Sequence, residues 1–238
     1  MLNVDTLQGK TFVDVGSGSG LFSLAARNLG ASVHSFDYDP NSVACTQQLR
    51  QRFFANDTQW VVEHGSVLDA HYMEHLGTFD VVYSWGVLHH TGAMWQALDN
   101  VATLVRPGGL LFIAIYNDSG LSSRLWTQVK YMYNRLHPKL RFLVVWPAAV
   151  RLWGPTTIRD VLRGRPLATW QNYGEKRGMS PWEDLIDWVG GYPYEVAKPG
   201  EIFEFYRRKG FRLQKLITTE KNGCNEYVFS LDGSVSAR

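Results

Sequence analysis

Short apolar runs alternate with amphipathic stretches through the first half of the chain. The runs fall at Thr11–Val15, Ser32–Phe36, Trp60–Glu63, Asp80–Ser84 and Leu110–Tyr116. Each run is followed by a turn and, in most cases, by a stretch with helical spacing, an alternation that is typical of a parallel sheet. We therefore predict five parallel strands with helices on both faces.

The later part of the sequence predicts a helix followed by two antiparallel strands. The helix covers Glu201–Lys209 and ends at Gly210. The strands are Phe211–Thr218 and Asn225–Leu231, and the Asn222-Gly223 pair between them tolerates positive φ in a hairpin turn. The predicted fold class is α/β: a Rossmann-like, seven-stranded, mainly parallel sheet with a C-terminal antiparallel hairpin.

Residues 119–197 interrupt this rhythm with amphipathic, aromatic-rich sequence. Apolar residues at helical spacing predict one buried helix face: Leu125, Val129, Met132, Tyr133 and Leu136. We interpret the segment as a helical lid insertion. The expected organisation is an α/β core over residues 1–118, the lid over 119–197, and a helix and hairpin over 198–238 that complete the core.

The cysteines and the apolar runs exclude several classes of protein. Cys45 and Cys224 lie far apart without a metal-ligand spacing, so neither a disulfide framework nor a zinc site is predicted. The most apolar run, Phe142–Val150, is shorter than a membrane span and contains Pro147. A soluble, cytoplasmic protein is expected.

The net charge of +2 hides an asymmetry along the chain. Residues 1–123 carry five Lys and Arg against eleven Asp and Glu, whereas residues 124–165 carry nine against one. The basic segment is compatible with an anionic or aromatic substrate, with RNA, or with a membrane surface. A solvated face over a small helical core is the plainer interpretation.

A glycine-rich turn is the strongest signal for a ligand. Gly16, Gly18 and Gly20 lie between a predicted strand and a predicted helix, where missing side chains let backbone N–H groups approach a ligand. A nicotinamide-binding turn would carry its third glycine where Leu21 stands. Asp14 lies inside the strand, where a buried carboxylate needs a polar role, such as a water-mediated contact with an ammonium group.

Two further segments complete a predicted nucleoside site. Asp37 ends the second predicted strand, nineteen residues after Gly18, and in a βαβ unit it reaches the same crevice and accepts both ribose hydroxyls. Tyr38 is placed to flank an adenine. The run from Gly65 to Asp69 follows the third strand and offers an apolar side chain for the ring and polar groups for its exocyclic amine.

In this order and spacing, DVGSGSG, FDYDP, GSVLD, FDVVYSWGVLHH and VRPGG resemble the class I S-adenosylmethionine-dependent methyltransferase family. The resemblance covers residues 10–118 and, less specifically, 199–231, and is closest to the small-molecule branch typified by quinone-biosynthesis methyltransferases. It implies S-adenosyl-L-methionine as cofactor. The implied contacts are Asp14, Gly16, Gly18 and Gly20 for the methionine end, Asp37 for the ribose, Ser66 and Val67 for the adenine, and Trp85 near the sulfonium. Ser66 replaces the acid common at its position.

The predicted chemistry needs little from the protein beyond positioning. A sulfonium is an activated methyl donor, so transfer requires an oriented acceptor and excluded water, and no metal. A hydroxyl acceptor also needs a base, and His89 and His90 follow the fourth predicted strand at the carboxyl edge of the sheet. Tyr116 and Asn117 end the fifth strand at that edge and are candidates for orienting the acceptor. The LHH sequence is also a structural element in the family.

The lid contains a tight loop with aromatic residues and a carboxylate. Two glycines stand before Tyr192, and a proline separates Tyr192 from Tyr194 and Glu195. Tyr192, Tyr194 and Glu195 are candidates for substrate contact. The alternative is that they pack within the lid. We expect the lid to close over the crevice and to determine substrate choice.

The predicted function is transfer of the methyl group of S-adenosylmethionine to an O, N or C atom of a small-molecule acceptor. The alternatives are an RNA (tRNA) methyltransferase, favoured by the basic segment, a protein-modifying enzyme, and a non-catalytic S-adenosylmethionine-binding module. SWGVLHH stands where amino-group DNA methyltransferases carry an NPPY-like run, and Cys224 lacks a Pro-Cys context, so both base-methylating classes are disfavoured. The acceptor and the oligomeric state stay open.

Overall fold

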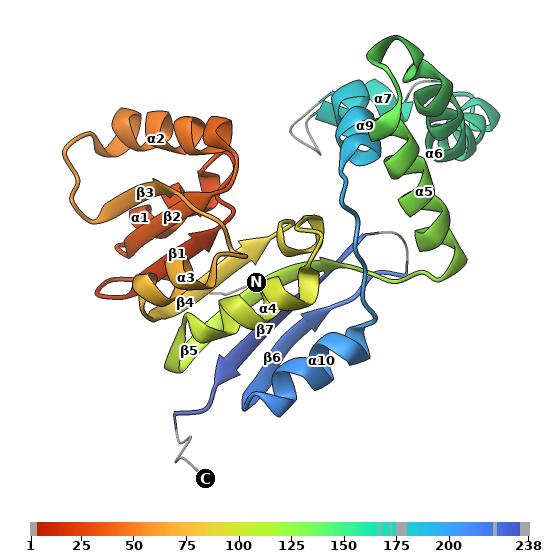
Figure 1. The fold of residues 1–238 in the computed structure, drawn as a ribbon. Helices are drawn as coiled ribbons and strands as arrows, with labels where there is room; N and C mark the ends of the chain where they lie inside the picture. The colour runs from red at the N-terminus through yellow and green to blue at the C-terminus, as the bar shows by residue number, and fades with distance from the viewer. Residues whose placement is uncertain (1–3, 167, 172, 175–179, 221–222, 234–238) are drawn as a thin grey trace. The chain divides into compact units, whose positions relative to one another are not determined.

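Seven strands form a mixed sheet in the order β3-β2-β1-β4-β5-β7-β6 (Figure 1). The structure, a computed structural model, describes residues 4–166, 168–171, 173–174, 180–220 and 223–233. The strands are β1 (Thr11–Val15), β2 (Ser32–Asp37), β3 (Trp60–His64), β4 (Phe79–Trp85), β5 (Val105–Tyr116), β6 (Phe211–Ile217) and β7 (Cys224–Leu231). Strands β1 to β5 are parallel, and β7 is antiparallel to β5 and to β6. The predicted mainly parallel sheet with antiparallel C-terminal strands is confirmed.

The central strands are buried on both faces. All residues of β4 except Trp85 are buried, as are the five residues 111–115 of β5. Their near-continuous apolar sequence follows from this position, because both faces of a parallel sheet are covered by helices. The predicted hairpin turn, Glu220 to Gly223, includes residues 221–222, which lie outside the described part of the chain.

Each face of the sheet has its own apolar core. On one face, Met73 of α3, Leu98 of α4 and Ile202 of α10 pack on strand residues that include Val13 and Ile113. On the other face, helices α1 and α2 cover a smaller cluster around Phe12 and other strand residues. The helices are α1 (Leu21–Asn28), α2 (Pro40–Phe54), α3 (Ala70–Leu76), α4 (Met94–Thr103) and α10 (Pro199–Arg208), with the short 3₁₀ turn η1 (Leu88–His90).

The chain divides into two compact units. A core unit comprises Met1–Ser119 and Glu195–Arg238, and an insertion unit comprises Gly120–Tyr194. The insertion unit contains α5 (Leu121–Arg135), η2 (Pro138–Leu140), α6 (Phe142–Leu162), α7 (Ala168–Gln171) and α9 (Pro181–Gly190). No helix within the described ranges is long and apolar enough to cross a membrane.

Aromatic rings pack around a buried lysine inside the insertion unit. Trp126 of α5 meets Trp188 of α9 edge to face, with ring centroids 5.5 Å apart. Lys130 is fully buried; its Nζ donates a hydrogen bond to the Trp188 carbonyl and lies 4.2 Å and 4.8 Å from the ring centroids of Trp188 and Tyr194. These contacts are cation–π interactions in a desolvated setting.

The predicted buried face of the first lid helix is correct for Tyr133 and wrong for Leu125 and Met132. Leu125 and Met132 are exposed, and the buried residues of α5 are Ser123, Trp126, Lys130 and Tyr133. The helix is therefore rotated relative to the expectation, because the two aromatic rings and the aliphatic stem of Lys130 fill the space against α9. Because a lysine does not count as apolar, the hydrophobic pattern of α5 did not include Lys130 and predicted a different buried face.

Candidate functional site

The turns after β1 and β4 touch at the point where the strand order reverses. Gly16 has φ of +78°, and a Cβ built on it would lie 2.4 Å from Val87 Cγ2 in the loop after β4. Residue 16 therefore has no room for a side chain, and its backbone conformation also favours glycine. In open α/β sheets, ligands bind in the crevice at this reversal point.

Gly18 differs from Gly16 in what surrounds it. Its φ is +53°, and nothing lies within 4 Å of the place where a Cβ would stand. The amides of the turn are already used inside the protein: Gly16 donates to Phe36, Gly18 to Asp37 and Gly20 to Ser17. The amides of the three glycines therefore hold the turn in its shape, the turn offers space beside Gly18, and its contact with a ligand stays a prediction.

Asp37 is held at the end of β2 by two main-chain amides. Its Oδ2 accepts a hydrogen bond of 2.9 Å from the Gly18 amide, and its Oδ1 accepts one of 2.9 Å from the Asp39 amide. A carboxylate has about four acceptor positions, so two positions are left for further donors such as a pair of hydroxyls. The side chain is partly exposed beside the glycine turn, and its contact with a ribose stays a prediction.

Asp14 is the end of a buried chain of hydrogen bonds that the sequence analysis missed. Trp60 Nε1 donates to Ser35 Oγ over 2.9 Å, Ser35 Oγ donates to Ser23 Oγ over 2.7 Å, and Ser23 Oγ donates to Asp14 Oδ2. Burial raises the pKa of Asp14 to about 6, although the Ser23 hydroxyl works in the opposite direction. The site thus holds a desolvated carboxyl group that a nearby cation would ionise.

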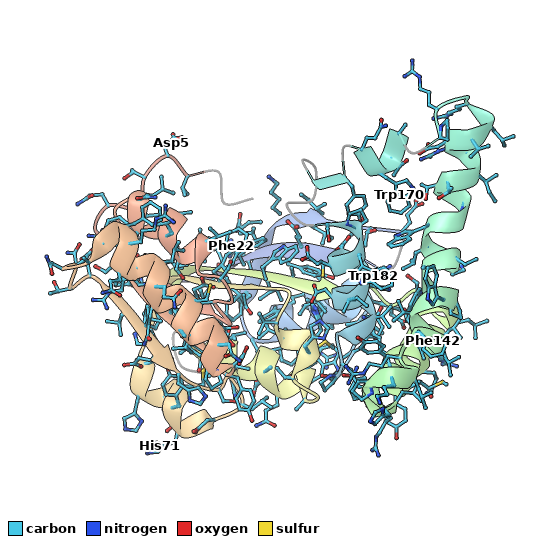
Figure 2. The ribbon with its side chains drawn as sticks, turned by 90° about the horizontal axis from the view of Figure 1, so that it is seen from above. Asp5, Phe22, His71, Phe142, Trp170 and Trp182 are labelled. Atoms are coloured by element: carbon cyan, nitrogen blue, oxygen red, sulfur yellow. The ribbon has the colours of Figure 1, made fainter. Side chains whose placement is uncertain are left out.

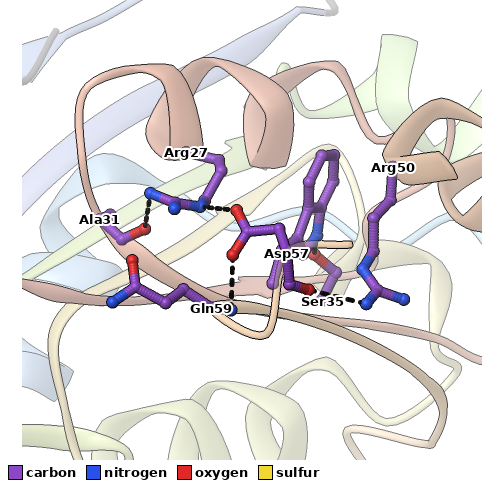
Figure 3. A network of polar contacts seen from close by, with 7 residues as sticks. Arg27, Ala31, Ser35, Arg50, Asp57 and Gln59 are labelled. Carbon is purple, nitrogen blue, oxygen red and sulfur yellow. Dashed lines mark hydrogen bonds and ion pairs between the residues drawn. The ribbon is translucent and has the colours of Figure 1, made fainter. Parts of the chain in front are cut away.

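Part of this chain appears in Figure 3 beside an ion-pair network that braces the first βαβ unit. Arg27 of α1 forms an ion pair with Asp57, whose other carboxylate oxygen accepts from the Gln59 amide over 2.7 Å. Arg50 of α2 donates to the Asp57 carbonyl over 2.8 Å. The Arg27 guanidinium holds the pKa of Asp57 below its usual range. The network fixes both helices to the start of β3.

Thr46 is a second contact that the sequence analysis missed. Its Oγ1 donates to the Gly18 carbonyl and lies 3.1 Å from Ser17 Oγ, and its side chain meets the place where a Cβ on Gly20 would stand. Helix α2 thereby braces the glycine turn. The only sequence signal for it is a small polar residue in an otherwise amphipathic helix.

The residues predicted for adenine lie around the ends of β2 and β3. Tyr38 is 75% exposed, and its carbonyl is 2.9 Å from His64 Nε2. Ser66 is partly exposed, and its Oγ accepts a hydrogen bond from the Leu68 amide. Val67 is buried in the larger core and its carbonyl accepts from Asn100, so only a small part of its side chain can meet a ligand.

Trp85 stands at the carboxyl end of β4 with 45% of its surface exposed. Its Nε1 donates a hydrogen bond of 3.2 Å to Glu226 Oε1 on β7, two strands away in the sheet. Phe22, at the start of α1, is another exposed ring of the core unit and contacts Tyr83, with ring centroids 4.8 Å apart (Figure 2).

The two candidate bases have different surroundings. His89 is completely buried, and its ring centroid lies 4.0 Å from that of Tyr116. His90 is partly exposed and meets the Tyr116 ring edge to face at 5.5 Å. The structure therefore brings the histidines and Tyr116 together at the ends of β4 and β5, and it is His90 whose ring reaches the surface.

Asn117 and Glu195 are engaged in holding the core unit together. In the Asn117 side chain, Nδ2 donates a hydrogen bond to the Thr219 carbonyl and Oδ1 accepts one from Asn225 Nδ2. Both carboxylate oxygens of Glu195 lie within 3.2 Å of the Met94 amide, where they cap α4, and the Glu195 amide donates to the His89 carbonyl. Asn117 and Glu195 therefore both have structural roles, which their prediction as substrate contacts did not include.

Tyr192 and Tyr194 belong to the insertion unit. Tyr192 is 42% exposed, and its ring lies 5.7 Å from that of Tyr131. Tyr194 is buried against Lys130 and Trp188. Tyr194 thus packs within the insertion unit, whereas the Tyr192 ring is accessible for contact with another molecule.

Comparisons with known proteins agree with this architecture. Residues 13–111 match the family model of a methyltransferase domain. The chain is 32% identical over 118 residues to a ubiquinone biosynthesis O-methyltransferase of Escherichia fergusonii, covering 49% of this chain and 47% of that protein. It is 33% identical over 109 residues to the Colwellia psychrerythraea enzyme of the same name, covering 45% and 42%. The matched region thus spans about half the length of these curated relatives.

Solved structures extend the likeness of fold to nearly the whole chain. Magnesium protoporphyrin IX methyltransferase from Synechocystis with bound SAH has a TM-score of 0.56 at 15% identity, covering 95% of this chain and 76% of that one. PKMT2 from Rickettsia typhi in complex with AdoHcy has a TM-score of 0.63 at 13% identity, covering 97% and 50%. Residues 13–111 thus resemble a methyltransferase domain, and the seven-stranded sheet has the fold of these solved methyltransferases.

Proposed function

We propose that the chain binds S-adenosylmethionine at the carboxyl ends of β1 and β2 and transfers its methyl group to a small-molecule acceptor. The observation that best supports this proposal is the Asp37 carboxylate, which is fixed by the amides of Gly18 and Asp39 beside the open glycine turn. A carboxylate at this position of an α/β sheet is suited to a ribose diol. The names of the curated relatives support an O-methyl transfer, and an oxygen acceptor is the form we favour.

The residues present fit the cofactor's charge and polarity. Asp37 has acceptor positions left for two ribose hydroxyls, and Asp14 contributes a buried carboxyl group that favours the ammonium end. Exposed Tyr38 and the Ser66 backbone are the adenine contacts in this proposal. When bound, the sulfonium supplies an activated methyl group that an oriented nucleophile can attack.

His90 is the proton acceptor in this proposal. Its partly exposed ring sits against Tyr116 at the end of β5, while the buried His89 positions the loop through its ring and its carbonyl. The neutral imidazole accepts the hydroxyl proton as the methyl group is transferred. Trp85 forms a wall of the acceptor side, with its indole held by Glu226.

The insertion unit is the proposed lid that determines acceptor choice. Tyr192 is the residue of its loop that we assign to acceptor contact, because its ring is exposed, whereas Tyr194 packs beside Lys130. Closure of such a lid excludes water from a reacting centre. Replacing residues 120–194 by a short linker is expected to abolish methyl transfer and leave cofactor affinity largely intact.

A screen with labelled methyl donor tests the function. The full chain is incubated with S-[methyl-³H]adenosylmethionine and cell extract, with one arm treated with ribonuclease and one with protease. Label in a small organic-soluble product that survives both treatments is expected. Label that disappears with ribonuclease would assign the alternative RNA function, and cofactor binding without transfer to any fraction would assign a binding module.

A further inference from the structure

The outer face of α6 is an apolar stripe without charge. The stripe contains Leu143, Trp146, Val150, Ile158 and Val161, all of which are exposed. Their separations of three, four, eight and three residues place them on one side of a helix. At about 1.5 Å per residue the stripe is roughly 27 Å long.

The opposite side of the same helix is already occupied. Val144, Val145, Ala148 and Ala149 are buried, and α6 packs on α5 and α9 within the insertion unit. The helix is therefore apolar on two sides, one of which builds the unit. An exposed apolar face of this extent is unusual for a solvated surface and marks an interaction site.

Positive charge accompanies the stripe. Exposed basic residues stand before, within and after the helix: Lys139, Arg151, Arg159, Arg163 and Arg165. The single acid of the segment 124–165, Asp160, is buried, and its Oδ2 accepts from the Thr169 amide, so it is turned away from the surface. Arg151 directly follows Val150 and borders the stripe, where its long side chain can reach past an apolar boundary.

Tryptophans lie where the stripe meets α9. Trp146 and Trp182 are both exposed, and their ring centroids are 6.1 Å apart; Figure 2 marks Trp182 at the start of α9 and Phe142 at the start of α6. Tryptophan is enriched at the boundary between lipid and water, because one part of the ring is apolar and the N–H remains solvated.

We propose that this face, defined by the stripe residues and by Arg151 at their edge, docks on the surface of an anionic phospholipid bilayer. The apolar residues would enter the boundary of the acyl chains while Arg151 meets the phosphate groups. Charge decides against a second copy as occupant, because two such faces would bring like charges together. A face led by aliphatic residues is also unsuited to RNA, which binds through phosphate contacts and stacked bases.

Vesicle sedimentation with the full chain tests the proposal. The protein is mixed with vesicles of phosphatidylglycerol and phosphatidylcholine, or of phosphatidylcholine alone. Binding to the anionic vesicles that weakens with salt is expected. Trp146→Ser/Val150→Ser should reduce the partition coefficient about tenfold or more, because two apolar side chains are lost from the contact. Arg151→Gln should reduce the preference for anionic over neutral vesicles, whereas Arg163→Gln, on the opposite side of the helix, should leave it nearly unchanged.

A matched variant controls for loss of apolar surface in general. Phe53 and Val61 are exposed apolar residues of the core unit, at 55% and 41%, so Phe53→Ser/Val61→Ser should bind vesicles like the wild type. Circular dichroism and a melting curve confirm that each variant is folded. Equal binding by wild type and Trp146→Ser/Val150→Ser, or no binding of wild type to anionic vesicles, would overturn the proposal. A wild-type dimer that this variant converts to a monomer would assign the face to a second copy instead.

Discussion

The main-chain amide of Gly18 donates a hydrogen bond of 2.9 Å to Asp37 Oδ2, joining the turn after β1 to the end of β2. The contact fixes the carboxylate before any ligand arrives. The Gly18 amide thus has its hydrogen-bond partner inside the protein, while the space beside the Gly18 Cα stays open. Pre-positioning of this kind reduces the ordering cost of binding.

Gly16→Ala should destabilise the protein by about 3 kcal/mol. The added Cβ would overlap Val87, and φ of +78° is unfavourable for alanine. Gly18→Ala is the matched control, because its Cβ would meet nothing within 4 Å; a loss of roughly 1 kcal/mol is expected from its φ alone. Chemical denaturation measures both. Val87→Ala should partly rescue Gly16→Ala; no rescue would show that overlap with Val87 is not the cause.

Stability should depend on pH through Asp14. Its pKa is raised by burial to about 6 from its ordinary value of 3.8, so between these values the folded chain binds more protons than the unfolded chain. Stability without cofactor therefore falls as pH rises from about 4 to 6, by on the order of 3 kcal/mol. Asp14→Asn should flatten this part of the profile in urea titrations. A wild-type profile identical to that of the variant would contradict the assignment.

The two histidines should separate into a base and a structural residue. His90→Ala is expected to lower turnover by about 10²–10⁴-fold with little change in cofactor affinity, provided that the acceptor loses a proton. His89→Ala removes a fully buried ring packed on Tyr116 and should lower stability by about 2–5 kcal/mol. Kinetics and thermal melting distinguish the two effects. Full turnover in both variants would mean that neither ring is the base.

Lys130 should make the insertion unit more stable at alkaline pH. Burial lowers the pKa of Lys130 to about 8, against the raising effect of Asp187. Between pH 8 and about 10.5 the unfolded chain binds the extra proton, so stability rises with pH in this window. Lys130→Met keeps the apolar stem and should abolish that rise, with a gain of up to about 3 kcal/mol at pH 7. A stability loss at pH 7 would mean that the cation–π contacts outweigh desolvation.

The sheet was predictable because strand and turn signals act locally. Thr11–Val15 was predicted with the bounds it has, and the Gly16 to Asp37 constellation follows from one strand-turn-helix-strand sequence. Contacts between distant segments left no such signal. The bond from Trp60 to Ser35 and the capping of α4 by Glu195 depend on how the strands and loops meet, which periodicity does not encode.

The same limit applies to the lid helices. Lys130 interrupts the apolar pattern of α5 yet lies in its buried face, because only the aromatic rings of α9 make that position favourable. In α6 the difficulty is an excess of apolar residues. Its sequence is apolar on two sides, and sequence periodicity alone cannot identify which side packs on α5 and α9.

Isothermal titration of S-adenosylhomocysteine into the full chain tests the cofactor site most directly. We expect saturable binding with one site per chain, stronger than any binding of NADH. Asp37→Ala should weaken it by about 1–3 kcal/mol, because ribose hydroxyls lose their acceptor. Asp99→Ala, an exposed carboxylate on α4 paired with Lys209, should leave it unchanged. Saturable binding of NADH without binding of S-adenosylhomocysteine, or equal affinity in Asp37→Ala and wild type, would contradict the account.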